Sequence, residues 1–179
     1  MWTPEDGLLG ALAPLGLAIA AGSAIVIDLD PAGPQYPGDR SLADLASDGV
    51  RRPDLVPRSG VGVVRNGGVA PADAGQVIHA LIAAHPTVVL RLPPRPYPEG
   101  VPFPVVPVRL LVPGGLFPVG NRPAVYQATP VLARMPTEGV RLPVPNPATV
   151  AALLHGRRPV ARDRWIAAWG RAWRFPWSQ

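Results

Sequence analysis

The stretch "SAIVIDLDPAG", residues 23–33, decides how the whole chain is interpreted. An uninterrupted apolar run, Ala24 to Ile27, passes directly into the acidic residues Asp28 and Asp30. Such runs are typical of parallel strands that are covered on both faces. Side chains that follow such a strand lie at its carboxyl end, where open α/β sheets bind their ligands. The stretch therefore predicts a buried parallel strand and raises the question of whether a nucleotide binds beside it.

Helix-like and strand-like segments alternate on both sides of this stretch. Ser41 is in place to cap one helix, and Gly22 and Gly49 stand where helices would stop. The alternation predicts βαβ units, hence an α/β fold with a doubly wound, mostly parallel sheet and flanking helices. The expected helices cover 11–21, 40–50 and 70–85, and the expected strands cover 24–29, 60–64 and 87–92.

Residues 93–147 have a different composition, because they hold 15 of the 26 prolines. Proline lacks the backbone donor that a strand or helix needs, so few long elements are expected there. We expect strands at 105–112 and 123–129, as edge strands, and loop elsewhere. Two helices should follow, at 146–156 with Asn146 as the cap and at 160–174. We treat the chain, 1–179, as a single domain.

Composition excludes several kinds of chemistry. The chain has no cysteine and no lysine, and all 17 basic residues are arginine. Disulfides, thiolate catalysis, Schiff-base chemistry and a phosphate-loop lysine are therefore impossible here. Residues 155–179 hold six arginines and one acid, which equals the net charge of +5 for the whole chain. A basic end on a neutral body indicates a segment directed at a surface rather than a general nucleic-acid binder.

Residues 7–27 carry no charge and are long enough to consider as a membrane span. Pro14, several glycines and the strand-like end of the stretch favour a buried helix followed by a buried strand instead. The start, "MWTPED", is acidic where a signal peptide would be basic. We therefore expect a cytoplasmic protein.

The order of these segments resembles the ParA/MinD family of deviant Walker ATPases. The resemblance rests on "LGLAIAAGSAIVIDLDPAG" (15–33), "PRSGVGVVRNGG" (57–68), "VIHALIAAHPTVVLRLPP" (77–94) and "GVRLPVPNPATVAALLHGRRPV" (139–160). Members of this family are doubly wound P-loop NTPases that position chromosomes, septa and other cargo. The resemblance implies that Asp28 matches the acid that positions water or magnesium.

Departures from the family pattern fall on its nucleotide-binding residues. Glu5 and Asp6 stand about where the family has Lys-Thr, and carboxylates there would repel a triphosphate. The position of the Walker B aspartate is occupied by Arg91, and the family's first strand has no counterpart in the sequence. The sequence thus predicts a pseudo-ATPase with no catalytic residues, no cofactor and no metal.

Other candidate sites have alternatives that the sequence leaves open. Asp28 and Asp30 are either a lone magnesium site or relic acids, with Asp30 capping the turn before Pro31. The segment "RNGG" (65–68) is either an anion-binding nest or a tight turn. The three histidines, His79, His85 and His155, lack metal-ligand spacing.

The C-terminal segment 160–179 is predicted to form an amphipathic helix. Trp165, Trp169 and Trp173 fall on one face, and Arg164 and Arg171 lie opposite with Arg174 at the side. The tryptophans either pack in the protein's own core, or insert into an anionic membrane surface, or dock into a partner.

The expected function is that of a non-catalytic interaction protein. Its partner would be an active ParA-type ATPase, a second copy of the chain, or division or pilus machinery. One alternative is a peripheral accessory protein held on the inner face of the membrane by the C-terminal helix. Another is an enzyme that uses Asp28 and Asp30 on a small phosphorylated substrate. No specific nucleic acid is expected, because no basic stripe exists outside the tail.

Overall fold

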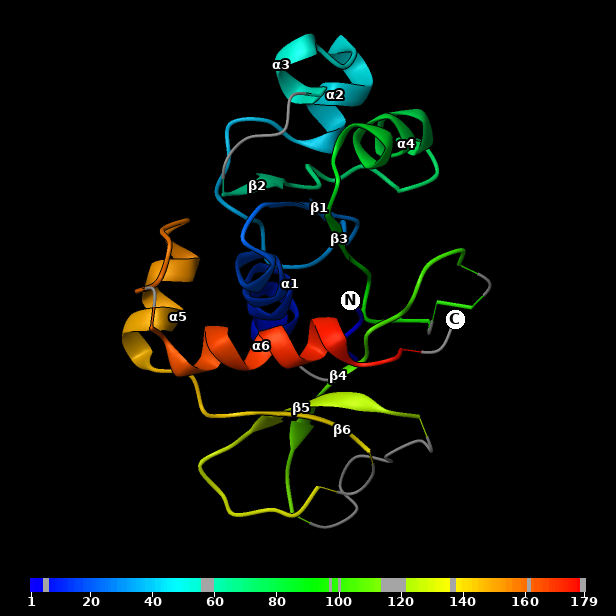
Figure 1. Cartoon of the computed structure of the whole chain (residues 1–179). Helices are drawn as coiled ribbons and strands as arrows, with labels where there is room; N and C mark the ends of the chain where they lie inside the picture. Colours follow the sequence, from blue (N-terminus) through cyan, green and yellow to red (C-terminus); the bar gives the residue numbers. More distant parts are fainter. Residues whose placement is uncertain are drawn as a thin grey trace.

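The computed structural model has two three-stranded sheets with helices packed against them (Figure 1). It describes residues 1–4, 7–55, 60–96, 98–99, 101–113, 122–135, 138–160 and 162–177. The helices are α1 (Gly7–Ala21), α2 (Leu42–Asp48), α3 (Arg52–Leu55), α4 (Gly75–Ala84), α5 (Pro147–Leu154) and α6 (Arg164–Arg174). The strands are β1 (Ala24–Asp28), β2 (Val61–Val64), β3 (Val88–Arg91), β4 (Val108–Leu111), β5 (Ala124–Ala128) and β6 (Gly139–Leu142).

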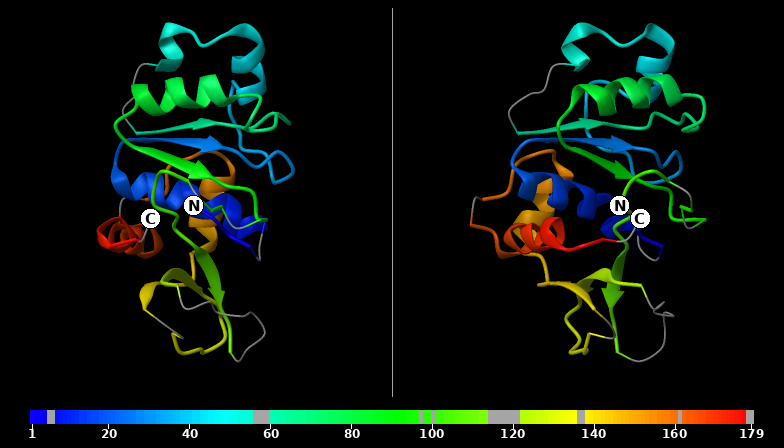
Figure 2. Two further views of the ribbon diagram at one scale, coloured as in Figure 1. Left: turned by 90° about the vertical axis from the view of Figure 1, so that its right-hand side faces the viewer. Right: turned by 45° about the vertical axis from the view of Figure 1, so that its right-hand side comes forward.

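The first sheet has the strand order β2-β1-β3 and is parallel throughout. β1 is its central strand and is buried along its whole length. α2 and α4 cover one face and α1 covers the other (Figure 2). Cover on both faces explains why β1 reads as a continuous apolar run. The predicted parallel strand and its two neighbours are confirmed.

The second sheet has the order β4-β5-β6 and is also parallel. Both strands expected in this half are present, but the edge position expected for 123–129 is wrong, because β5 is central. β6 lies where a loop was expected. It begins at Gly139, where φ is +155° and a Cβ would lie 2.0 Å from the Ala124 carbonyl oxygen. The prolines of this half lie outside the three strands, so their ladders remain intact.

The first two residues connect the two sheets. The Leu92 amide donates to the Met1 carbonyl oxygen at 3.0 Å, and the Trp2 amide donates to the Val106 carbonyl oxygen at 3.0 Å. The Val108 amide returns a bond to the Trp2 carbonyl oxygen at 2.8 Å. Met1 and Trp2 therefore link the ends of β3 and β4 through backbone hydrogen bonds, and Trp2 forms an isolated parallel bridge with Pro107. The fold is α/β and compatible with a Rossmann-like arrangement.

The predicted caps and stops lie at helix ends, although α1 begins at Gly7 rather than at 11, α4 at Gly75 rather than at 70, and α6 at Arg164 rather than at 160. The Ser41 hydroxyl accepts from the Asp44 amide, and the Asp44 carboxylate accepts from the Ser41 amide at 2.8 Å, which forms a capping box. Asn146 caps α5. Gly22 and Gly49 follow the ends of α1 and α2 with φ of 88° and 79°, values that glycine adopts without strain. The predicted caps and stops are confirmed.

The uncharged stretch 7–27 forms α1, a turn and β1, as the favoured interpretation predicted. In the part of the chain that the structure describes, no helix is both long enough and apolar enough to cross a membrane.

α6 packs against α1 through its tryptophans. Trp165 and Trp169 are 1% and 0% exposed. Their rings meet edge to face with centroids 5.4 Å apart, a preferred aromatic geometry. Gly16 of α1 gives them room, since a Cβ there would lie 2.3 Å from Trp169 Nε1 and 2.6 Å from Trp165 Cζ3. Trp165 and Trp169 thus belong to the protein's own core, and their assignment to an exposed interaction face is corrected.

Candidate functional site

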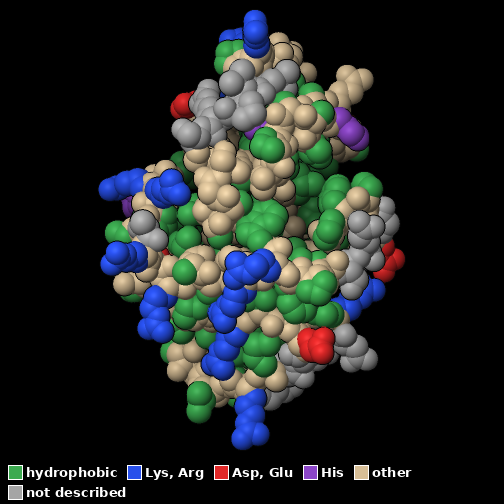
Figure 3. Space-filling view, viewed as in Figure 1, with side chains coloured by type: hydrophobic (Ala, Val, Ile, Leu, Met, Phe, Trp, Pro, Cys, Tyr) green, Lys and Arg blue, Asp and Glu red, His purple; other side chains and the backbone are tan. Residues whose placement is uncertain are grey.

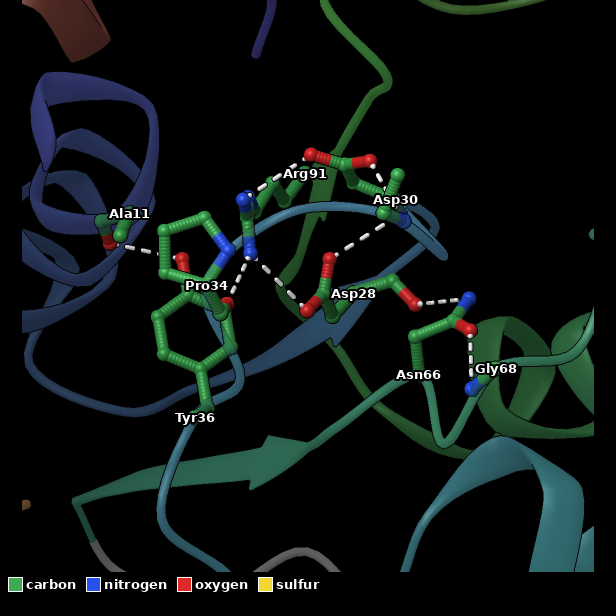
Figure 4. A network of polar contacts seen from close by, with 9 residues as sticks. Ala11, Asp28, Asp30, Pro34, Tyr36, Asn66, Gly68 and Arg91 are labelled. Carbon is green, nitrogen blue, oxygen red and sulfur yellow. Dashed lines mark hydrogen bonds and ion pairs between the residues drawn. The ribbon is translucent and has the colours of Figure 1, made fainter. Parts of the chain in front are cut away.

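Two adjacent strands of the first sheet end in charged side chains of opposite sign. Asp28 is the last residue of β1 and Arg91 is the last residue of β3, and the two are partners in the strand register. Partners on neighbouring parallel strands project to the same face, so their side chains meet. Asp30 follows two residues after the end of β1 and approaches the same guanidinium (Figure 4).

Arg91 forms an ion pair with each carboxylate. Its Nη1 lies 3.0 Å from Asp28 Oδ2 and its Nη2 lies 3.0 Å from Asp30 Oδ2. The side chains of Arg91, Asp28 and Asp30 are 3%, 0% and 8% exposed. A guanidinium is planar and carries several donors in a fixed geometry, which suits it to bridge two acids.

The other oxygen of each carboxylate is bonded to the backbone. Asp28 Oδ1 accepts from the Asp30 amide at 3.0 Å, and Asp30 Oδ1 accepts from the Ala32 amide at 3.2 Å. All four carboxylate oxygens therefore already accept a hydrogen bond from the chain itself. The second bond is the turn cap that the sequence offered as one role for Asp30.

Tyr36 and Pro34 complete the surroundings of the guanidinium. Arg91 Nη1 donates to the Pro34 carbonyl oxygen at 2.7 Å, and the guanidinium carbon lies 5.3 Å from the centroid of the Tyr36 ring. This is cation–π distance. The Tyr36 hydroxyl donates to the Ala11 carbonyl oxygen at 2.6 Å, and burial raises the pKa of the Tyr36 phenol.

Gly33 permits this close packing. A Cβ at Gly33 would lie 2.0 Å from Arg91 Nη2 and 2.2 Å from Asp30 Oδ2. Any larger side chain would therefore displace the ion pair, because real contacts of that length do not occur.

Asn66, part of the "RNGG" segment, joins the network through a contact with Asp28 that the sequence did not predict. Its side chain is completely buried; Nδ2 donates to the Asp28 carbonyl oxygen at 3.2 Å, and Oδ1 accepts from the Gly68 amide at 2.8 Å. Its place just after β2 was the available signal, because carboxyl ends of parallel strands meet at one edge. Gly67 and Gly68 have φ of 79° and 85°, so "RNGG" forms a turn held by Asn66.

Burial dominates the electrostatics of Asp28. It raises the pKa of Asp28 to about 6, although Arg91 and the hydrogen bond from the Asp30 amide act in the opposite direction. Above that pKa the Asp28 carboxyl is ionised beside the Arg91 guanidinium. A divalent cation would have to displace the guanidinium, since like charges at this distance repel strongly in a buried site.

The remaining predicted residues lie apart from the network. Among the described residues, no group of three or more histidine, aspartate or glutamate side chains could hold a metal ion. Ring nitrogens of His79, His85 and His155 lie within hydrogen-bond distance of backbone carbonyl oxygens. Glu5 and Asp6, predicted to lie at the phosphate position, are outside the described residues.

The C-terminal helix presents its arginines to solvent. Arg164, Arg171 and Arg174 are exposed, and Trp173 is 41% exposed with its Nε1 donating to the Leu17 carbonyl oxygen at 2.7 Å. Asp163 caps the helix by accepting from the Trp165 and Ile166 amides at 2.8 and 2.9 Å. Trp165 Nε1 donates to Gln127 Oε1 at 2.6 Å. Sequence reasoning missed Gln127, a polar residue inside a buried strand.

Comparison of the chain with protein-family models, with curated proteins and with solved structures gave no match.

Proposed function

We propose that this chain is a ParA/MinD-like pseudo-ATPase with a P-loop NTPase-like fold that acts without catalysis. It would serve as an interaction or positioning partner in chromosome partitioning, division-site placement or pilus and pole localisation. The observation that most strongly supports this proposal is the position of the Arg91 guanidinium between Asp28 and Asp30. The proposal also rests on the resemblance of the segment order to that family.

Arg91 stands at the position that the resemblance assigns to the Walker B aspartate. In an ATPase of this kind, acids at the strand ends face a magnesium ion and water. Here the positive charge comes from the chain itself, at 3.0 Å from each acid. A built-in cation satisfies the carboxylates permanently, which supports loss of the nucleotide-dependent cycle.

Absence of lysine from the sequence supports the same conclusion. A phosphate loop uses backbone amides together with a lysine that neutralises the β- and γ-phosphates. The chain holds 17 arginines and no lysine, and Glu5 and Asp6 add negative charge near the expected loop. Nucleotide binding of ordinary ATPase affinity is therefore not expected.

The proposed mechanism is docking without turnover. A protein that keeps the fold of a partner ATPase can keep the surface by which such proteins pair, while its own state does not change with nucleotide. It would be a cytoplasmic protein that binds an active ParA-type ATPase, a second copy of itself, or cargo machinery.

Co-purification tests this proposal. The tagged full chain would be recovered from its native cells, and bound proteins would be identified by mass spectrometry. Recovery of an intact ParA-type ATPase, or of division or pilus components, supports the proposal. An R164Q/R171Q/R174Q variant, altered only at exposed arginines, shows whether capture is merely electrostatic. Recovery of nothing above background, or equal loss of every captured protein in that variant, would contradict it.

A second candidate function is peripheral association with an anionic membrane. The supporting observation is that α6 carries exposed arginines together with Trp173, which is 41% exposed. Arginine and tryptophan together suit the headgroup region. Flotation with phosphatidylserine vesicles should be lost in the same triple variant and in high salt. Flotation that persists in both conditions would contradict this function.

A further inference from the structure

A cleft of about 670 Å³ is lined by β2 and by the C-terminal end of α5. Its apolar lining includes Ile25 of β1, Val63 of β2 and Leu15 of α1. Residues 36–40 also line the cleft, together with Arg51, Pro53 and Asp54. A cleft of this size with both apolar and charged side chains in its lining suits a small organic ligand.

This cleft is separate from the arginine–aspartate network. Its lining includes Ser23 and Ala24 at the start of β1, whereas Asp28 is at the other end of the strand. With a rise of roughly 3.3 Å per residue, these ends are on the order of 13 Å apart. Tyr36 connects the two sites, because it lines the cleft and its ring also faces Arg91.

Positive charge predominates in the lining. Arg40, Arg51, Arg157 and Arg158 line the cleft together with Asp39 and Asp54. Arg40 pairs with two acids, since its Nη1 lies 3.4 Å from Asp54 Oδ2 and its Nη2 lies 3.7 Å from Asp48 Oδ2. Arg51 reaches an acid only at 4.0 Å, in an exposed pair with Asp48, and such pairs contribute little.

Arg157 and Arg158 are the cations available to a ligand. Both are exposed, and neither forms an ion pair within the described ranges. Figure 3 shows basic side chains gathered over α5 on this side of the molecule. An unpaired arginine presents several donors to a phosphate or carboxylate oxygen.

The turn that follows α5 places Arg157 and Arg158 at the opening of the cleft. α5 ends at Leu154, and Gly156 has φ of +65°, which turns the chain. A Cβ at Gly156 would lie 3.2 Å from Pro37 Cγ, so the turn closely approaches Pro37 of the cleft lining. Arg157 and Arg158 follow at once and so border the cleft opening.

We propose that this cleft binds a small anion with an apolar body. The ligand would be a phosphate monoester or a carboxylate. Its ring or short hydrocarbon part lies against the valines of β2 that line the cleft, and its anionic group meets Arg157 and Arg158. This binding does not depend on the proposed loss of nucleotide at the other end of the strands, and the two ideas can fail separately.

Calorimetric titration of the full chain with 1-naphthyl phosphate tests the proposal. 1-Naphthol lacks the anionic group, inorganic phosphate lacks the ring, and 1-naphthoate replaces phosphate by carboxylate. We expect one saturable site for the ester, and weaker binding of both naphthol and phosphate. An R157Q/R158Q variant should lose at least about tenfold in affinity. The matched control, R162Q/R164Q, removes the same charge from arginines that do not line the cleft and should stay within about twofold.

Three results would overturn the proposal. The first is the absence of saturable binding of 1-naphthyl phosphate and of 1-naphthoate. The second is an equal loss in the two variants, which would mean general electrostatic attraction. The third is binding of 1-naphthol as tight as that of the anions, which would mean that the cleft does not recognise charge. All four substituted arginines are exposed, and thermal melts of both variants verify that the fold is kept.

Discussion

At the scale of residues, the Arg91 guanidinium supplies the positive charge that two buried carboxylates need. Asp28 is inaccessible to solvent, so its ionised form depends on Arg91 at 3.0 Å and on the amide of Asp30. Removal of one member of a buried ion pair leaves the other uncompensated, which costs far more than an exposed pair contributes.

Substitution of Arg91→Leu should therefore be strongly destabilising. We expect the free energy of unfolding to fall by about 3–5 kcal/mol at pH 8, and by less at pH 5, where Asp28 can take up a proton. Urea denaturation followed by circular dichroism measures both values. Arg134→Leu, at an exposed arginine, should change stability by about 0.5 kcal/mol or less. A loss for Arg91→Leu as small as that of the control would contradict the role given to the network.

The raised pKa of Asp28 predicts a pH dependence. Its pKa is about 6 in the folded chain and 3.8 in the reference state, so the folded protein binds the proton more tightly. This contribution to stability is complete below the unfolded pKa and is lost as the pH rises to about 6. Between these values it should decrease by up to about 3 kcal/mol.

Denaturation of the wild type and of Asp28→Asn at several pH values measures this effect. For each protein, the free energy of unfolding is plotted against pH. The difference between the two slopes separates the contribution of Asp28 from that of other titrating groups. Asp73→Asn, an exposed control, should keep the wild-type slope. Identical slopes for the wild type and Asp28→Asn would show that the pKa of Asp28 is not raised by folding.

The sequence was sufficient to locate much of this network, but not to build it. Asp28, Asp30 and Arg91 each follow or end an apolar run, so their shared edge could be predicted. Their bonding could not, because it depends on the in-register pairing of β1 with β3 and on the space left by Gly33. The contact of Asn66 with Asp28 was missed because "RNGG" is explained equally well by a simple turn.

At the scale of elements, the caps and stops of individual helices were predictable and the packing of α6 was not. Ser41, Asn146 and Gly49 act locally, so their effect is visible in the sequence. The tryptophan face of α6 was compatible with the protein's own core, a membrane surface or a partner protein. Amphipathic periodicity indicates that a helix face is covered, but it does not indicate what covers it. Gly16 on α1, which receives the tryptophan rings, is 149 residues before Trp165 and gave no local signal.

Gly16→Ala tests the close approach of α1 and α6. The added Cβ would overlap Trp169 Nε1, so we expect a loss of about 1–3 kcal/mol in unfolding free energy. Gly10→Ala in the same helix meets Thr3 Cβ at an ordinary 3.7 Å and should be stabilising by up to about 1 kcal/mol. Thermal melts of both variants measure these changes in stability. Equal gains in stability would show that the helices do not pack as closely as described.

At the scale of the whole molecule, one apolar cluster and one short segment connect the two sheets. The cluster contains Val26 and Val89 from the first sheet and Val108 and Val125 from the second, together with α1 and α6. Met1 and Trp2 add backbone hydrogen bonds to both sides. The sequence could not predict this connection, since the spatial order of strands is a tertiary property.

This connection predicts a single cooperative unfolding transition. The tryptophans of α6 report on the second sheet and α1, and amide exchange of β1 reports on the first sheet. Both signals should change at the same urea concentration, because loss of either sheet exposes the shared cluster. Two transitions separated along the urea axis would show instead that the sheets fold independently.

The most direct test of the central claim is calorimetric titration of the full chain with magnesium–ATP. We expect no saturable heat, because the Arg91 guanidinium already pairs with Asp28 and Asp30 and the chain has no phosphate-binding lysine. Saturable binding with a dissociation constant in the low micromolar range would contradict the pseudo-ATPase proposal and return Asp28 and Asp30 to a role beside a nucleotide.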